Sequence, residues 1–199
     1  IATSATILAS FTGIVFGLIA GFVGGAVDKA ISFVTDLFLT LPFLLMALII
    51  APILSERFAL YPDTYKTMQV ASLIAILSFF GWMPIARLVR GEVLSLRERE
   101  FILSAQVIGM PTSRIMVKEL LPNLVAPIVV AVSLMLPAFI AAEAGLAFLG
   151  VGITQGFSWG QTILRASDYF QTYPLYLWEP LLGIVILVLE RSGRIPDRG

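Results

Sequence analysis

Cysteine and histidine are both absent from this 199-residue chain. Without cysteine, the chain can form no disulfide bond and no thiolate metal site. Without histidine, it has no histidine-based catalytic triad, no His-Glu-x-x-His zinc site and no histidine proton relay. The sequence also lacks a GxxxxGK[ST] phosphate-binding loop. These gaps remove many of the common catalytic and metal-binding chemistries.

Charged residues are scarce as well. They make up 13% of the chain, against about 25% in a typical soluble domain. Hydrophobic residues make up 58%, and the mean hydropathy is +0.95. The net charge is zero and no basic run is present, so a nucleic-acid partner is not expected. We predict an all-α, polytopic membrane helix bundle with about five spanning helices.

Five apolar runs mark the predicted spans. They cover about residues 1–26, 30–54, 69–89, 120–142 and 180–189. The last run reaches full length only if it begins near Tyr173. Asp28 and Lys29 are expected to form a polar turn between the first two runs. No soluble domain and no internal repeat is visible.

Glycine and proline add detail to two of these runs. Gly13, Gly17 and Gly21 recur every four residues, which places them on one helix face where another membrane helix can approach closely. The fourth run contains Pro122, Pro127 and Pro137, which together predict a bent or irregular helix. The mixed segment 143–178, which is rich in glycine, polar residues and aromatic rings, is expected to form short helices near the membrane interface.

Lysine and arginine are divided unequally between the two sides that five alternating spans would create. The larger set is Lys29, Arg87, Arg90, Arg97, Arg99, Arg114, Lys118, Arg191, Arg194 and Arg198, and the smaller is Arg57, Lys66 and Arg165. The positive-inside rule then places the loop 91–118 and the C-terminus in the cytoplasm. The segments 55–68 and 143–172 are expected outside.

The segment 95–122 is a charged interruption between two apolar runs. Ser95 followed by Glu98 fits a capping box, which predicts a short helix of about three turns. The expected apolar face of this helix is formed by Phe101, Ile102, Ala105 and Ile108. This pattern alone allows a rigid cytoplasmic knob or an amphipathic helix that lies on lipid headgroups.

Stop and start signals follow this helix. Gly109 comes after its last residue and Pro111 two positions later, which is a usual way for a helix to end. Thr112 or Ser113 is expected to cap a second helix. A short helix with its own stop signal would therefore lead directly into another.

This segment resembles the EAA loop of bacterial ABC-importer permeases. That pattern is Glu-Ala-Ala, three residues, Gly, and a gap that ends in Leu-Pro. The residues that occupy its positions here are Leu103, Ser104, Ala105, Gly109, Leu121 and Pro122. The Glu and the first Ala of the triplet are absent. The stretches 87–92, 142–146, 148–152 and 158–160 extend the resemblance, which is to the C-type subunit of dipeptide and oligopeptide permeases in the binding-protein-dependent transport family.

The resemblance implies a permease transmembrane domain at residues 1–190, followed by an atypical tail at 191–199. The family has six spans, so the first is expected to be missing here. It further implies a bacterial inner-membrane protein that forms half of a translocation pathway for peptides. The subunit would be no enzyme and would bind no cofactor, because its two cytoplasmic ATPase partners would use ATP and Mg.

Two groups of site residues follow from the resemblance. The short helix would be a coupling helix that docks on an ATPase subunit, with coupling residues Leu103, Ser104, Ala105, Gly109, Arg114, Leu121 and Pro122. The pathway would lie between this chain and a homologous B-type permease, and an extracytoplasmic peptide-binding protein would face segment 143–172. The candidates near the pathway or the binding protein are Asp36, Glu143, Trp159 and Glu179. An ion pair between Glu143 and Arg165 is an equal alternative.

Other functions remain to be compared with this one. A permease for nickel or another small solute is the nearest alternative, although the lack of histidine and cysteine argues mildly against handling a soft metal. An intramembrane enzyme would need an activated nucleophile or paired carboxylates, and Asp36 has no obvious partner at the same depth. A passive channel would not need a capped cytoplasmic knob.

Overall fold

The computed structural model describes residues 1–58, 65–149 and 151. Helices make up nearly all of these residues and no strand lies among them, so the predicted all-α fold is confirmed. The elements in order are α1 (Ala2–Val23), α2 (Gly25–Leu39), α3 (Phe43–Phe58), α4 (Tyr65–Leu96), α5 (Glu100–Val107), α6 (Thr112–Ile115), the π-helical turn η1 (Met116–Leu120) and α7 (Leu121–Phe148).

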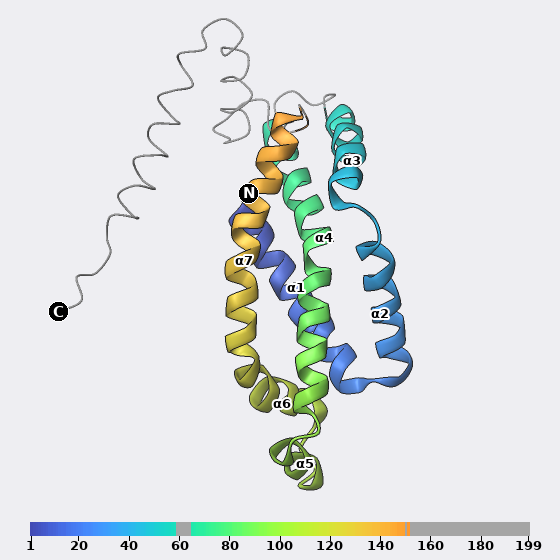
Figure 1. Ribbon diagram of the computed structural model, residues 1–199, viewed down its shortest axis with the longest axis vertical. Coiled ribbons are helices and arrows are strands. Elements are labelled where there is room, and N and C mark those ends of the chain that lie inside the picture. Colours follow the sequence, from blue (N-terminus) through green and yellow to red (C-terminus); the bar gives the residue numbers. More distant parts are fainter. Residues whose placement is uncertain (59–64, 150, 152–199) are drawn as a thin grey trace, which may run out of the picture.

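Three long helices form the centre of the bundle (Figure 1). α1, α4 and the stretch 112–148 are each long and apolar enough to cross a membrane, and the bent pair α2–α3 adds a fourth crossing if it is one span. The chain is therefore a multi-pass membrane protein. The fifth predicted run, 180–189, lies outside the described residues.

The glycine face of α1 packs against α4, as its spacing predicts. A Cβ atom added at Gly13, Gly17 or Gly21 would lie 2.7 Å from the Cβ atom of a residue in α4. These α4 residues are, in order, Ile85, Val89 and Val93. The residue numbers of the α1 glycines and of their α4 neighbours increase together, so α1 and α4 run parallel. The helices can come this close only because glycine has a hydrogen atom in place of a side chain.

The second predicted span is not one helix. α2 and α3 meet at a bend of 83°, with the break at residues 40–42. Pro42 lacks an amide hydrogen, and its ring disfavours a helical conformation at Leu41, so the helix is interrupted here. We call this break, residues 40–42, the elbow.

The turn before α2 also differs from the prediction. Asp28 and Lys29 lie inside α2, and the chain reverses at Gly24 and Gly25, whose φ angles are +69° and +61°. Two consecutive residues in the left-handed region provide a sharp corner that glycine adopts without steric cost. Charge alone was a poor guide to the position of this turn.

α7 is continuous where three prolines predict irregularity. Pro127 and Pro137 both lie inside the helix, which runs to Phe148. The irregular part is the π turn η1, which comes just before Pro122. Pro122 cannot donate a backbone hydrogen bond. The side-chain amide of the next residue, Asn123, donates to the Glu119 carbonyl at 2.6 Å. Residues 143–148, expected to begin a set of short interfacial helices, continue α7 instead.

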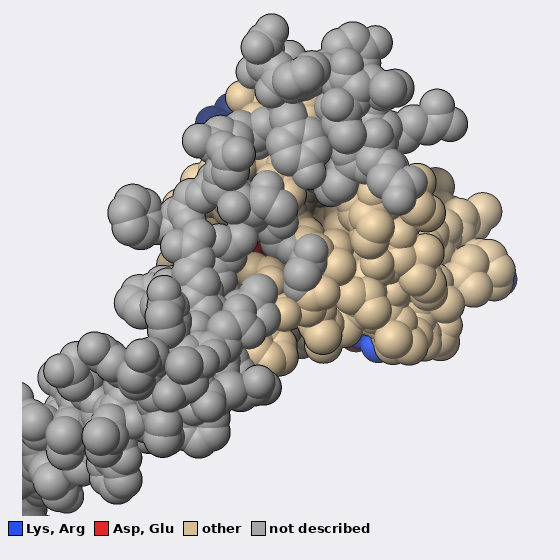
Figure 2. Space-filling view, turned by 90° about the horizontal axis from the view of Figure 1, so that it is seen from above, with Lys and Arg blue, Asp and Glu red and all other residues tan. Residues whose placement is uncertain are grey.

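The two ends of the bundle differ in charge. α5 and α6 lie at one end, together with the last turns of α4 and the corner between α1 and α2 (Figure 1). Figure 2 views the molecule from the opposite end, where the visible described surface is almost entirely uncharged. Most charged residues of the described helices lie in α2, in the second half of α4 and between α4 and α7, toward the end that carries α5.

Candidate coupling and pathway sites

α5 is a separate short helix, but it starts later than the capping box predicts. Ser95 lies in the last turn of α4, and α5 begins at Glu100 after an extended Arg99 that makes no side-chain cap. The eight residues of α5 form about two turns, one fewer than expected. The capping-box prediction was wrong because α4 continues through Ser95 to Leu96.

The C-terminus of α5 forms the stop that Gly109 predicts. Gly109 has a φ angle of +81°. The Met110 amide donates to the Ala105 carbonyl at 3.0 Å, and the Gly109 amide donates to the Gln106 carbonyl at 2.9 Å. These two bonds define a Schellman motif, in which a left-handed residue ends the helix and turns the chain.

One face of α5 anchors it to the bundle. Ile102 and Ala105 are buried in a cluster with Ile115 and Leu120, which lie in α6 and η1. The expected apolar face is therefore only half correct. Phe101 and Ile108, which were assigned to it, are exposed. Because no side-chain cap bond fixes the start of α5, this apolar packing is what holds that end of the helix against the bundle.

The opposite face of α5 is exposed and largely apolar. Leu103 is 48% exposed, Val107 87% and Ile108 82%, and the Ser104 side chain lies among them, hydrogen-bonded to the Glu100 carbonyl at 2.8 Å. Exposed aliphatic side chains of this kind, on a helix held rigid from behind, are typical of a protein contact surface. We call Leu103, Ser104, Val107 and Ile108 the knob face.

The structure distributes the predicted coupling residues over three environments. Leu103 and Ser104 lie on the knob face, whereas Ala105 is buried beneath it. Arg114 and Pro122 are exposed beside α5, and Leu121 is partly buried against the cluster that anchors it. The second helix begins after an extended Pro111 with no side-chain cap, so the predicted Thr112 or Ser113 cap was wrong.

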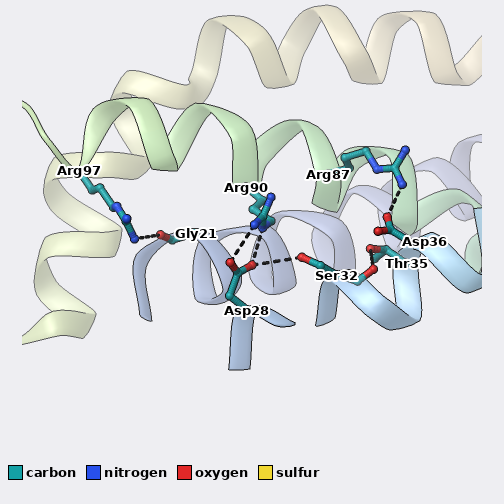
Figure 3. A network of polar contacts seen from close by, with 8 residues as sticks. All are labelled: Gly21, Asp28, Ser32, Thr35, Asp36, Arg87, Arg90 and Arg97. Atoms are coloured by element: carbon teal, nitrogen blue, oxygen red, sulfur yellow. Dashed lines mark hydrogen bonds and ion pairs between the residues drawn. The ribbon is translucent and has the colours of Figure 1, made fainter. Parts of the chain in front are cut away.

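A charged network joins α4 to the corner between α1 and α2 (Figure 3). Arg90 forms a two-point ion pair with Asp28, in which its Nη2 atom donates to Oδ2 at 2.8 Å and its Nε atom donates to Oδ1. Ser32 also donates to Asp28 Oδ1, at 3.2 Å. Directly after the last residue of α4, Arg97 donates to the Gly21 carbonyl at 3.3 Å. Sequence reasoning missed this network.

Asp36 belongs to the same network. Its carboxylate accepts a hydrogen bond from Arg87, an ion-pair partner that the sequence did not indicate. These two side chains are 60% and 57% exposed, whereas Asp28 and Arg90 are 17% and 32% exposed. An exposed ion pair contributes about 0.2–1 kcal/mol. The partly buried, two-point pair is therefore the stronger of the two.

Glu143 lies inside the bundle rather than at the end of its helix. It is 8% exposed, and its Oε1 atom is buried without a hydrogen-bond partner among the residues that the structure describes. Phe139, one turn earlier on the same helix face, packs against Ala9 and Leu77. An unpartnered carboxylate oxygen in such surroundings is costly, and an ionisable residue within a span is a functional candidate for that reason.

An aromatic cavity of about 450 Å³ lies at the elbow. Its lining comes from both sides of the elbow, from α4 and from α7, and includes Phe38, Phe43, Phe80, Pro84 and Phe139. Phe43 and Phe80 make an edge-to-face contact with ring centroids 5.7 Å apart. The sequence signal that could have located this cavity is Pro42, which creates the elbow.

The remaining predicted site residues are not placed. Trp159 and Glu179 lie outside the described residues, as does Arg165, the alternative partner of Glu143. Their assignment to a pathway or to a binding-protein contact stays a prediction. Among the candidates that are described, Asp36 and Glu143 lie in different settings: Asp36 is exposed in the last turn of α2, just before the elbow, and Glu143 is buried in α7.

Comparison with known families identifies one match. Residues 13–189 match the family described as "Binding-protein-dependent transport system inner membrane component". This range includes α5, the charged network and the elbow.

Individual relatives are permease proteins of bacteria. The chain is 32% identical over 179 residues to the oligopeptide transport system permease protein OppC of Bacillus subtilis (strain 168), covering 89% of this chain and 54% of that protein. It is 34% identical over 164 residues to OppC of Mycobacterium tuberculosis (strain H37Rv), covering 81% and 53%. It is 35% identical over 178 residues to the dipeptide transport system permease protein DppC of Alkalihalophilus pseudofirmus, covering 89% and 55%. The chain spans about half the length of these relatives.

Proposed function

The chain belongs to the binding-protein-dependent transport system inner membrane component family, and from this premise we propose that it is a permease subunit of an ATP-driven importer of dipeptides or oligopeptides. The peptide class is proposed because similar chains are named as oligopeptide and dipeptide permeases. The proposed role is to form half of the pathway and to convert ATPase motion into alternating access.

The observation that carries this proposal is the knob face of α5. Ile102 and Ala105 hold the helix from behind, and the Schellman motif at Gly109 fixes its end. Three aliphatic side chains then point outward from a small, rigid element. Such an element transmits force without a catalytic side chain. ATP and Mg would be used by two ATPase subunits that receive this face in a groove.

The proposed topology places α5 and the charged end of the bundle in the cytoplasm. Arg97, Arg99, Arg114 and Lys118 surround this end, and positive residues favour the cytoplasmic side of a bacterial inner membrane. α4 is 32 residues long, about 48 Å, which exceeds the roughly 30 Å hydrocarbon core. Its last turns would therefore project into the cytoplasm and carry α5 away from the lipid.

The proposed pathway lies along α7. In the most apolar 18-residue segment of residues 112–148, only 17% is buried inside the bundle. The corresponding segments of α1 and α4 are 44% and 50% buried. We assign part of its uncovered face to a homologous B-type permease, with the elbow cavity and Glu143 near the pathway. An extracytoplasmic binding protein would deliver peptide from the opposite end.

Cysteine crosslinking tests the coupling role directly, because the chain contains no cysteine. We expect Ser104→Cys in the assembled transporter to crosslink to an ATPase subunit, and Thr64→Cys not to do so. The measurement is the mobility of the crosslinked product on a denaturing gel. Equal crosslinking from both positions, or from neither, would contradict the assignment. Labelling of Thr64→Cys only from the cytoplasm would overturn the topology.

Replacement of Glu143 tests its place near the pathway. Glu143→Gln keeps the size and hydrogen-bonding capacity of the side chain and removes the charge. We expect the peptide concentration for half-maximal uptake to rise about tenfold, as for loss of a charge-assisted contact with a peptide amino terminus, with little change in thermal stability. Ser133→Ala, exposed on the same helix, is the control. An unchanged uptake curve would remove Glu143 from the pathway.

A further inference from the structure

The charged network ties the α1–α2 corner to the half of α4 that leads into α5. Arg87 and Arg90 lie on α4, and Arg97 directly follows its last residue; these side chains reach Asp36, Asp28 and the Gly21 carbonyl in that order (Figure 3). The contacts run along the second half of α4 and end in its connection to α5. We call these six residues the clasp.

The clasp holds α2 but not α3. Both acidic residues of the clasp lie in α2, before the elbow. The described side chains of α3 meet α4 through apolar packing, in which Ala47 and Ala51 contact Leu73 and Ile76. The two halves of the broken pair are therefore attached to α4 by different kinds of contact. Ion pairs with two-point geometry fix direction, whereas small apolar surfaces can slide over one another.

The elbow between these halves has room to change its angle. Residues 40–42 are not part of either helix, and the aromatic cavity of about 450 Å³ lies against them. This space is open to the outside of the bundle, so the aromatic rings that line it are not enclosed on all sides. A short non-helical break beside an unfilled space is a suitable hinge, because a few residues can absorb the change in backbone angles.

We propose that the clasp makes α2 move as one body with the end of α4 and α5, and that the elbow separates this movement from α3. The inference rests on the proposed function, since it describes the route by which motion at the knob face reaches the pathway. Asp28 and Arg90 act as positioning residues in this route. They touch neither peptide nor nucleotide, and they determine which helix follows α5.

Transport by clasp variants tests this proposal in the complete transporter, reconstituted in proteoliposomes. We expect Asp28→Asn to leave ATP hydrolysis in place and to lower the amount of peptide imported per ATP at least about fivefold. The double variant Asp28→Arg with Arg90→Asp restores an opposite pair and should recover most of that ratio. Glu98→Gln removes a nearby charge that has no ion pair among the described residues, and it should have no effect.

A distance measurement on the intact clasp covers the case in which these variants fail to assemble. Spin labels are placed at Phe101, which lies in α5 outside the knob face, and at either Phe33 in α2 or Ile49 in α3, all of them exposed. Between the nucleotide-free and vanadate-trapped states, the Phe101–Phe33 distance should stay constant while the Phe101–Ile49 distance changes. A change at Phe33, or no change at Ile49, would overturn the proposal.

The outcomes separate this proposal from the proposed function. Absence of peptide import by the wild-type assembly would refute the proposed function. If the wild type imports peptide, a wild-type ratio in Asp28→Asn would refute the clasp proposal alone. A loss in Asp28→Asn that the charge-reversed pair does not recover would also count against it, because it would assign Asp28 a role that does not need Arg90.

Discussion

Replacing Gly17 by leucine is expected to prevent accumulation of the folded protein in the membrane. A Cβ atom at this position would lie 2.7 Å from both the Ala86 carbonyl oxygen and the Val89 Cβ atom. Neither atom can move away, because one belongs to the α4 backbone and the other to a side chain that is 1% exposed. α1 and α4 would have to separate along their length.

The expected cost exceeds that of a usual core substitution. Overpacking typically costs about 1–3 kcal/mol, and here the whole leucine side chain must enter a helix contact that accepts only hydrogen. The measurement is the yield and melting temperature of detergent-solubilised protein by fluorescence-detected size-exclusion chromatography. Gly91→Leu is the matched control, because a Cβ atom at Gly91 has no neighbour within 4 Å. Equal yields from both variants would refute the close α1–α4 contact.

Replacing Gly109 by valine is expected to uncouple ATP hydrolysis from peptide uptake while leaving the protein inserted. The φ angle of +81° is unfavourable for any residue with a Cβ atom, by roughly 1–2 kcal/mol, and most unfavourable for β-branched residues. α5 has eight residues and no side-chain cap at its start. A strained terminus should therefore change the direction of the whole helix and its knob face.

Transport assays distinguish this effect from a packing effect. A Cβ atom at Gly109 would meet nothing of this chain within 4 Å, so a packing clash inside the bundle would not explain a loss of function in Gly109→Val. We expect peptide uptake to fall by at least about tenfold at near-normal ATP hydrolysis. Gly109→Asn is the control, since asparagine tolerates the left-handed region, and it should retain most of the uptake. Normal uptake by Gly109→Val would refute the coupling role of α5.

The features that were predicted correctly depend on local or one-dimensional signals. The spacing of Gly13, Gly17 and Gly21 defines a face whatever lies opposite it, and the structure shows α4 there. Gly109 ends α5 because its left-handed conformation is a local requirement. Hydrophobic length likewise locates α1, α4 and α7. Such signals need no knowledge of which segments meet in space.

The features that were missed depend on contacts between distant segments. Asp28 and Arg90 are 62 residues apart, and nothing in the local pattern of either indicates the other. Asp28 therefore looked like a turn residue, and the ion pair between Asp36 and Arg87 was not foreseen. Ser95 fits a helix start, yet α4 already occupies that position, because the Leu96 side chain packs on the cluster beneath α5. A helix that continues for tertiary reasons overrides a local capping pattern.

The position of Glu143 shows a similar limit. The sequence places it at the boundary of an apolar run, which favours an interfacial residue. α7 continues for another turn beyond it, and Leu146 and Ala147 are buried there as well. A charged residue such as Glu143 interrupts an apolar run in the sequence. It does not end the helix, because neighbouring residues of the bundle can bury its side chain.

The parallel contact between α1 and α4 has a consequence for biogenesis. The two helices cross the bundle in the same direction, and the α2–α3 pair lies between them in the sequence. The ribosome therefore makes α2 and α3 before α4 can meet α1. At about 5–20 residues per second, several seconds of translation separate Gly13 from its partner Ile85. During that interval the narrow glycine groove of α1 is open to lipid or to the insertion machinery. The glycine face of α1, which packs closely against α4 in the mature bundle, thus lacks its partner while the α2–α3 pair is synthesised.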